Sequence, residues 1–275
     1  MISAPVLAAV ERGGEWELPS LNHLFVFPDM PGTENWGVFS LNRVSLMLLF
    51  SALALATFFF LATRKGAMVP GRLQSVGESY VEFIRKLATD VIGHDGLKFV
   101  PFLGTLFVFI FLNNMFKITP FIMLPPTGRL HIPAFLAILV WLVYVGVGIK
   151  YQGFVGYFKE VLFPPGVPWP LYILLTPIEI LSNLIFRPVT LTFRLFANMV
   201  AGHILVVITL ITIHVFFVVG PGLPISIFAL IISPLVFAFE LFVIGLQAYI
   251  FVMLTAVYIS TSMHAHHEDE PVPVP

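Results

Sequence analysis

The segment from residue 161 to residue 263 is almost free of charge, and this constrains the fold more than any other feature of the chain. Its charged residues are only four: Glu179, Arg187, Arg194 and Glu240. Two long apolar stretches fill the segment, at 169–218 and 225–262, and a Gly-Pro-Gly turn signal separates them. A helix of about 20 apolar residues is long enough to cross the hydrocarbon core of a bilayer. The segment is therefore predicted to be embedded in a membrane.

Composition agrees with a membrane protein and excludes several other classes. Charged residues make up 11% of the chain and hydrophobic residues 58%, whereas about a quarter of a typical soluble chain is charged. This composition therefore argues strongly against a soluble globular enzyme. The formal net charge of -1 includes no basic excess that would neutralise a nucleic-acid backbone. The absence of cysteine excludes disulfides, thiolate metal sites and cysteine nucleophiles.

Three further uncharged runs precede the long stretches. They lie at 44–63, 99–116 and 132–149, and each is long enough to form a membrane-crossing helix. Residues 72–92 have a different pattern, with apolar side chains on one helical face and charged side chains on the other. We interpret 72–92 as an amphipathic helix at the membrane surface, because the chain offers little soluble protein for it to pack against.

The last two apolar stretches are too long to stand upright in a bilayer. Fifty helical residues would measure about 75 Å, whereas an upright span needs about 30 Å. Dividing 169–218 at Pro188 into two antiparallel spans would leave almost no connecting loop. We therefore predict an all-α polytopic protein with about five crossing helices plus the interfacial helix. Its last two helices are predicted to be long, steeply tilted and antiparallel.

Basic residues predict the orientation of the chain. Six Lys and Arg residues lie in 64–98, compared with two before the first span and two in the loop after the second. Cytoplasmic segments are enriched in Lys and Arg, which places 64–98 inside the cell. We expect an extracytoplasmic N-terminal segment at 1–43, a membrane domain at 44–263 and a cytoplasmic tail at 264–275. The expected location is the cell inner (plasma) membrane.

Polar residues in the long stretches lie on particular helix faces. Arg194 and Asn198 are four residues apart and share a face, while His203 points to nearly the opposite side. Three polar residues of the last stretch recur every seven residues on one face: Ser233, Glu240 and Gln247. Three more cluster one helical turn apart: Glu179, Ser182 and Asn183. Hydrogen bonding between helices is an alternative explanation for the neutral residues, and a mutual salt bridge is one for Arg194 and Glu240.

An arginine at this depth has a specific chemical use. It cannot release its proton at any accessible pH, so it acts as a fixed positive charge and not as a relay. Facing a mobile carboxylic acid, it would favour the ionised form of that acid. Glutamate and histidine, by contrast, can exchange protons and line a hydrated path. This combination is what an ion-translocating stator needs, because a leak past the fixed charge would dissipate the gradient.

Two segments resemble a known family. Residues 194–203, Arg-Leu-Phe-Ala-Asn-Met-Val-Ala-Gly-His, and the Gly-Leu-Gln-Ala-Tyr-Ile-Phe-Val-Met-Leu segment that begins at Gly245 resemble the signature of subunit a of F-type ATP synthases. The resemblance is close over 177–263 and looser over 64–120. It implies a non-catalytic membrane stator that couples proton flow to rotation and ATP synthesis. The implied partners are the c-subunit ring, the peripheral-stalk b subunits, the F1 sector and the lipid bilayer, and the resemblance implies no cofactor.

The resemblance also implies roles for individual residues. Arg194 matches the essential arginine that faces the ring carboxylate and keeps two half-channels apart. Asn198 and Gln247 match polar positions of the family near that arginine. His203 and Glu240 match the pair of the outer half-channel. Glu179 and Asn183 match two further polar positions of the implied proton pathway. Lys117 stands where some relatives carry an acid, and we interpret it as an interfacial anchor.

Two other classes of protein are alternatives to this interpretation. A secondary transporter would use Arg194 to bind an anionic substrate and would be expected to contain internal repeats, but no second copy of the Arg194 segment is found. An intramembrane enzyme would be expected to carry a motif such as H-E-x-x-H or G-x-S-x-G, and the sequence has neither. A histidine group near the C-terminus (His264, His266 and His267) is a candidate metal-binding tract, although we favour a solvated tail without metal.

Overall fold

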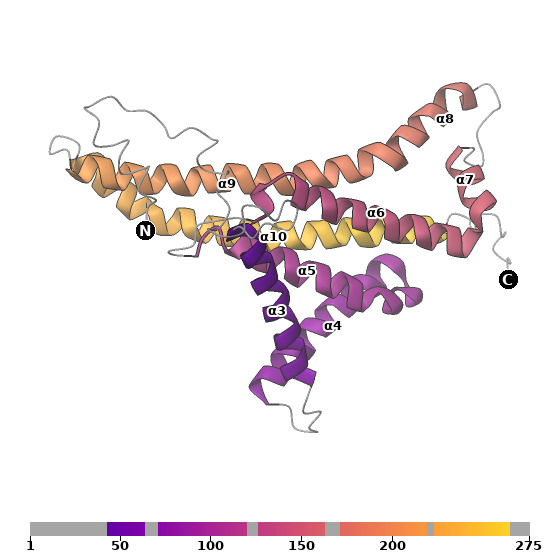
Figure 1. Ribbon diagram of the computed structural model, residues 1–275, viewed down its shortest axis with the longest axis horizontal. Helices are drawn as coiled ribbons and strands as arrows, with labels where there is room; N and C mark the ends of the chain where they lie inside the picture. Colours follow the sequence, from indigo (N-terminus) through magenta and orange to yellow (C-terminus); the bar gives the residue numbers. More distant parts are fainter. Residues whose placement is uncertain (1–42, 64–70, 120–125, 163–170, 219–222, 265–275) are drawn as a thin grey trace, which may run out of the picture. The chain divides into compact units, whose positions relative to one another are not determined.

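The computed structural model describes residues 43–63, 71–119, 126–162, 171–218 and 223–264 (Figure 1). All regular structure in these ranges is helical, which confirms the all-α prediction. The predicted extracytoplasmic segment, apart from Arg43, lies outside the described residues. So does the predicted cytoplasmic tail beyond His264, with two of the three candidate metal-binding histidines.

Five helical segments in the described residues are long and apolar enough to cross a membrane, as predicted. The first lies in α3 (Arg43–Thr63), and the second comprises the 3-10 helix η2 (His94–Phe99) and α5 (Val100–Met115). The third is α6 (His131–Gln152). The fourth and fifth are the long segments Leu174–Phe217 and Leu223–Met263, and the fifth lies in α10 (Leu223–His264).

The fourth span is one continuous helical run. It consists of α8 (Tyr172–Leu181), a π-helical turn η5 (Ser182–Phe186) and α9 (Arg187–Val218), which Figure 1 shows following one another without a loop. Pro188 has no N–H group to bond the carbonyl four residues earlier. The preceding N–H, of Arg187, bonds five residues back to the Ser182 carbonyl, which is the spacing of a π turn. The proline is thus absorbed within the helix, and 169–218 does not divide into two short spans.

The chain divides into two compact units. Unit 1 contains the described residues of 1–56, 109–129 and 196–247, and unit 2 contains those of 57–108, 130–195 and 248–275. Unit 1 thus holds the end of α5, most of α9 and the first part of α10. Unit 2 holds α4 (Arg72–Ile92), α6, α7 (Phe154–Leu162), α8 and the last part of α10.

Within unit 1, α9 and α10 pack as an antiparallel pair. Near the turn that joins them, the Ser226 hydroxyl donates a 2.8 Å hydrogen bond to the Ile213 carbonyl. Farther along, Asn198 Nδ2 donates to Gln247 Oε1 at 3.5 Å, so the contacts run in opposite order along the two helices. The predicted pairing of the last two long helices is therefore confirmed.

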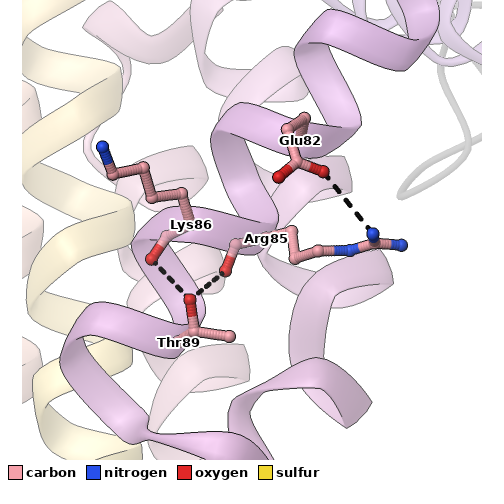
Figure 2. Close-up of polar contacts among 4 residues, drawn as sticks. All are labelled: Glu82, Arg85, Lys86 and Thr89. Carbon is pink, nitrogen blue, oxygen red and sulfur yellow. Dashed lines mark hydrogen bonds and ion pairs between the residues drawn. The ribbon is translucent and has the colours of Figure 1, made fainter.

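Within unit 2, α4 is amphipathic, as its sequence predicts. Ile84, Ala88 and Ile92 are buried, while the opposite face carries the polar groups shown in Figure 2. There, Arg85 Nη1 lies 3.5 Å from Glu82 Oε2, and the Thr89 hydroxyl donates to two backbone carbonyls of the preceding turn. Phe83, on the apolar side, is 43% exposed, and its ring contacts that of Phe107 at 5.8 Å between centroids.

The helix α7 is not predictable from the sequence. This helix of nine residues follows Gly153, whose φ of 77° is a left-handed conformation that suits glycine. It packs closely on α6, because a Cβ atom at Gly148 would overlap the ring of Tyr157. Residues 150–169 contain charges and several prolines, so the segment reads as a loop in the sequence.

Candidate functional site

Unit 1 contains a buried ion pair. Lys117, which follows α5, contacts Glu240 on α10 through its ammonium group, and the two side chains are 1% and 3% exposed. The prediction that Lys117 is an interfacial anchor is therefore wrong. Burying either charge alone would be strongly unfavourable, so each needs the other inside the protein. Glu240 thus takes Lys117 as its partner, and the mutual salt bridge with Arg194 is not needed to explain its burial.

The ion pair lies against the backbone of α9 at Gly202. A Cβ atom at this position would overlap both Lys117 Nζ and the Glu240 carboxylate. Any residue larger than glycine would therefore displace the pair. The next residue along α9 is His203, which is 4% exposed and so lies inside the same unit.

Two asparagines fix the end of α5 from which Lys117 extends. Asn113 Nδ2 donates to Ser51 Oγ at 3.0 Å, which ties α5 to α3. Asn114 Oδ1 accepts a 2.7 Å hydrogen bond from the Thr127 hydroxyl of the short helix η3 (Pro126–Gly128). All four side chains belong to buried residues. Polar groups from three separate segments thus hold the backbone next to Lys117.

The predicted pair Asn198 and Gln247 is brought together in unit 1. Asn198 is half-buried, Gln247 is 6% exposed, and their amides are joined by the 3.5 Å hydrogen bond that links α9 to α10. Gln247 Nε2 is buried and has no hydrogen-bond partner among the described residues. One amide donor is therefore available to a further group.

Arg194 belongs to unit 2 and lies on the exposed side of α9. Leu191 and Leu195, about 60° and 100° around the helix from Arg194, are buried, with exposures of 1% and 0%. Among the described residues of its unit, Arg194 forms no ion pair and no side-chain hydrogen bond. The contrast between exposed Arg194 and buried His203 agrees with the opposite faces predicted from their spacing.

The remaining two candidates, Glu179 and Asn183, form a second polar cluster in unit 2. Asn183 Nδ2 donates to Glu179 Oε2 at 3.0 Å, and the Asn183 carbonyl accepts a 2.7 Å hydrogen bond from the Tyr144 hydroxyl. The guanidinium of Arg187 lies 5.0 Å from the ring centroid of Tyr258, and 5.9 Å from that of Tyr144. Neither tyrosine is identifiable as a site residue from the sequence, because aromatic residues are frequent throughout the chain.

No group of three or more His, Asp or Glu side chains is positioned to hold a metal ion within the ranges that the structure describes. The polar groups gathered in the two units are instead carboxylates, amides, an imidazole and fixed cations. Such groups can bind and exchange protons or stabilise a passing charge.

The five apolar spans and their buried polar groups define a multi-pass membrane protein of the kind that moves ions across a bilayer. The family described as ATP synthase A chain matches residues 45–260, and the chain belongs to this family. As a member, it is a non-catalytic, proton-translocating membrane subunit. The secondary-transporter alternative is therefore set aside.

Bacterial relatives are similar over most of their length. An ATP synthase subunit a from a Nocardioides species is 44% identical over 84% of this chain and 84% of its own. The Rhodococcus erythropolis subunit a is 40% identical over 96% of this chain and 95% of its own. The Pseudarthrobacter chlorophenolicus subunit a is 38% identical over 93% of this chain and 96% of its own.

Proposed function

We propose that Arg194 is the fixed positive charge that faces a carboxylate of the c-subunit ring and keeps two aqueous half-channels apart. By doing so it would couple proton flow to ring rotation and ATP synthesis. The observation that carries this proposal is the exposure of Arg194 on α9 without an acidic partner in its own unit. Placing an arginine at mid-bilayer costs at least about 2.5–3.5 kcal/mol, so its counter-charge is expected from another chain.

The outer half-channel is assigned to the buried groups of unit 1. His203 and Glu240 can both exchange protons, and both lie in the protein interior. Asn198 and Gln247 cannot ionise, but their amides can hydrogen-bond water or a carboxyl group near the arginine. The free Nε2 donor of Gln247 supports this role.

The second half-channel is assigned to Glu179 and Asn183. Their direct hydrogen bond places a carboxylate beside an amide within unit 2. Glu179 is half-buried, so it can reach water more readily than Glu240, which is 2% exposed. A partly accessible carboxylate suits the end of a proton path that opens to solvent.

The orientation and partners follow from the same proposal. The N-terminus would lie outside the cell and the C-terminus in the cytoplasm, because the most basic connecting segment is then cytoplasmic. The helix face that carries Arg194 would contact the c-subunit ring. Peripheral-stalk b subunits would hold the chain against rotation, and the F1 sector would carry out the nucleotide chemistry.

Site-directed cross-linking tests the ring contact directly, because the chain contains no cysteine. Ala197→Cys and Ala201→Cys introduce thiols at exposed positions within about 60° of Arg194 around the helix. Each is combined with a cysteine next to the ring carboxylate, and Leu142→Cys on the exposed side of α6 serves as the matched control. Cross-links are expected at 197 and 201 and not at 142. Their absence from assembled complexes would contradict the proposal.

A further inference from the structure

The ion pair between Lys117 and Glu240 suggests a role for a residue outside the six pathway positions and the essential arginine. We propose that Lys117 is a positioning residue for proton transfer, whose ammonium group holds the Glu240 carboxylate against Gly202 in the outer half-channel. This inference rests on the function proposed above, which places Glu240 in that half-channel. Lys117 acts through Glu240 and does not itself carry the proton.

Burial makes the position of Glu240 depend on Lys117. The two side chains are 1% and 3% exposed, so water cannot replace either partner at low cost. Glu240 is not bonded by any other side chain among the described hydrogen bonds and ion pairs. A buried carboxylate is oriented by the cation that pairs with it. Without the ammonium group, Glu240 would lose the contact that orients it.

The shape of α9 supports a positioning role. Gly202 leaves a space that the ammonium and carboxylate groups fill together, and a methyl group there would overlap both. The carboxylate therefore lies against the α9 backbone one residue before His203. Lys117 thus holds the Glu240 carboxylate against the α9 residue that precedes His203, the other proton-exchanging residue.

The backbone that carries Lys117 is itself fixed. The hydrogen bonds of Asn113 to Ser51 and of Thr127 to Asn114 tie this part of the chain to two other segments. A lysine side chain loses rotamer freedom when it is ordered, and this loss opposes the formation of the ion pair. Because the backbone is already fixed, only the side chain of Lys117 loses conformational entropy when the ion pair forms. The framework is thus suited to presenting a cation at one place.

Two variants distinguish the effect of the Lys117 charge from the effect of its side-chain shape. Lys117→Met keeps an unbranched side chain of similar length without charge, whereas Lys117→Arg keeps the charge in a larger group. ATP-driven proton pumping is measured in inverted vesicles with the amount of assembled complex quantified. We expect Lys117→Met to lower pumping roughly tenfold and Lys117→Arg to retain at least about half. Pumping by Lys117→Met at the wild-type rate, or equal losses in both variants, would overturn the proposal.

A second pair of variants leaves both charges in place. Gly202→Ala inserts a methyl group where the ion pair lies, while Gly146→Ala on α6 adds one where no atom lies within 4 Å. Slower pumping is expected only for Gly202→Ala. If the Lys117→Met complex does not assemble, the comparison of Gly202→Ala with Gly146→Ala tests the positioning role of Lys117. An unchanged rate of proton pumping in Gly202→Ala would refute that role.

The proposed function can fail separately from this inference. Glu240→Gln tests whether the carboxylate belongs to the proton path at all. If Glu240→Gln slows pumping while Lys117→Met does not, the inference fails and the half-channel assignment remains. If neither slows pumping, the assignment of Glu240 to the half-channel fails as well.

Discussion

The Tyr144 hydroxyl on α6 donates a 2.7 Å hydrogen bond to the backbone carbonyl of Asn183. Asn183 lies in the π-helical turn, where the regular pattern of backbone hydrogen bonds is interrupted by Pro188. Hydrogen bonds between membrane helices contribute roughly 1–2 kcal/mol. Tyr144 satisfies the Asn183 carbonyl from a neighbouring helix and fixes the turn from which Asn183 reaches Glu179.

Removing only the Tyr144 hydroxyl tests this link. Tyr144→Phe is expected to lower the stability of the detergent-solubilised protein by about 1 kcal/mol, because one buried carbonyl loses its partner. The ring contact with Tyr258, at 5.7 Å between centroids, does not depend on the hydroxyl. Thermal unfolding measures the change. Tyr151→Phe, at an exposed position of α6, is the control, and an equal effect in both variants would argue against a special role for the Tyr144 hydroxyl.

Alkaline titration tests the anchoring of α4. Tyr80 donates a 2.6 Å hydrogen bond to the Gly104 carbonyl, and burial raises the pKa of its phenol above the ordinary value of 10.0. The folded state therefore keeps the phenolic proton at a pH where the unfolded state releases it. The resulting stabilisation is fully present below pH 10.0 and is lost progressively as the pH rises through the higher pKa of the folded state.

Tyr80→Phe should therefore be less stable than the wild type at neutral pH by about 1 kcal/mol, the value of a typical hydrogen bond. The difference should shrink above pH 10.0, because only the wild type can lose the Tyr80 proton on unfolding. Unfolding measured in detergent at a series of pH values follows this change. A difference that stays constant across the series would show that Tyr80 titrates as an ordinary tyrosine.

Replacing the buried carboxylate tests the outer half-channel. Glu240→Gln keeps the size of the side chain but cannot bind and release a proton, so we expect assembly to persist while proton flux falls roughly tenfold. Fluorescence quenching in inverted vesicles measures the flux. Glu82→Gln makes the same change in an exposed pair on α4, which should contribute little (Figure 2). Unchanged flux in Glu240→Gln would exclude Glu240 as a required protonatable site.

The membrane spans are predictable from the sequence because their evidence is local. Length, apolarity and absence of charge are readable within each segment, and α3, α5, α6 and the two long helical runs occupy nearly the predicted ranges. The opposite exposure of Arg194 and His203 also follows from local spacing on one helix. In contrast, α7 is short and lies in a segment with charges and prolines, so its apolar pattern gives too little signal.

The error at Lys117 has a different cause. Its partner Glu240 is 123 residues away along the chain, and no local pattern connects a lysine after α5 to a carboxylate on α10. The position of Lys117 at the end of a span fitted a snorkelling side chain equally well. Likewise, Pro188 is recognisable in the sequence as an interruption of the helix. The π turn before it, however, depends on which carbonyl accepts the hydrogen bond of the Arg187 N–H, and no sequence pattern indicates this.

We propose that the fixed charge of Arg194 couples proton flow to ATP synthesis. Arg194→Ala tests it most directly, in the complete complex reconstituted into vesicles and energised by an imposed proton gradient, with assembly confirmed in parallel. We expect proton-driven ATP synthesis to be abolished, because the ring carboxylate loses its opposing charge and the half-channels are no longer kept apart. Coupled ATP synthesis retained by the Arg194→Ala complex would contradict this proposal.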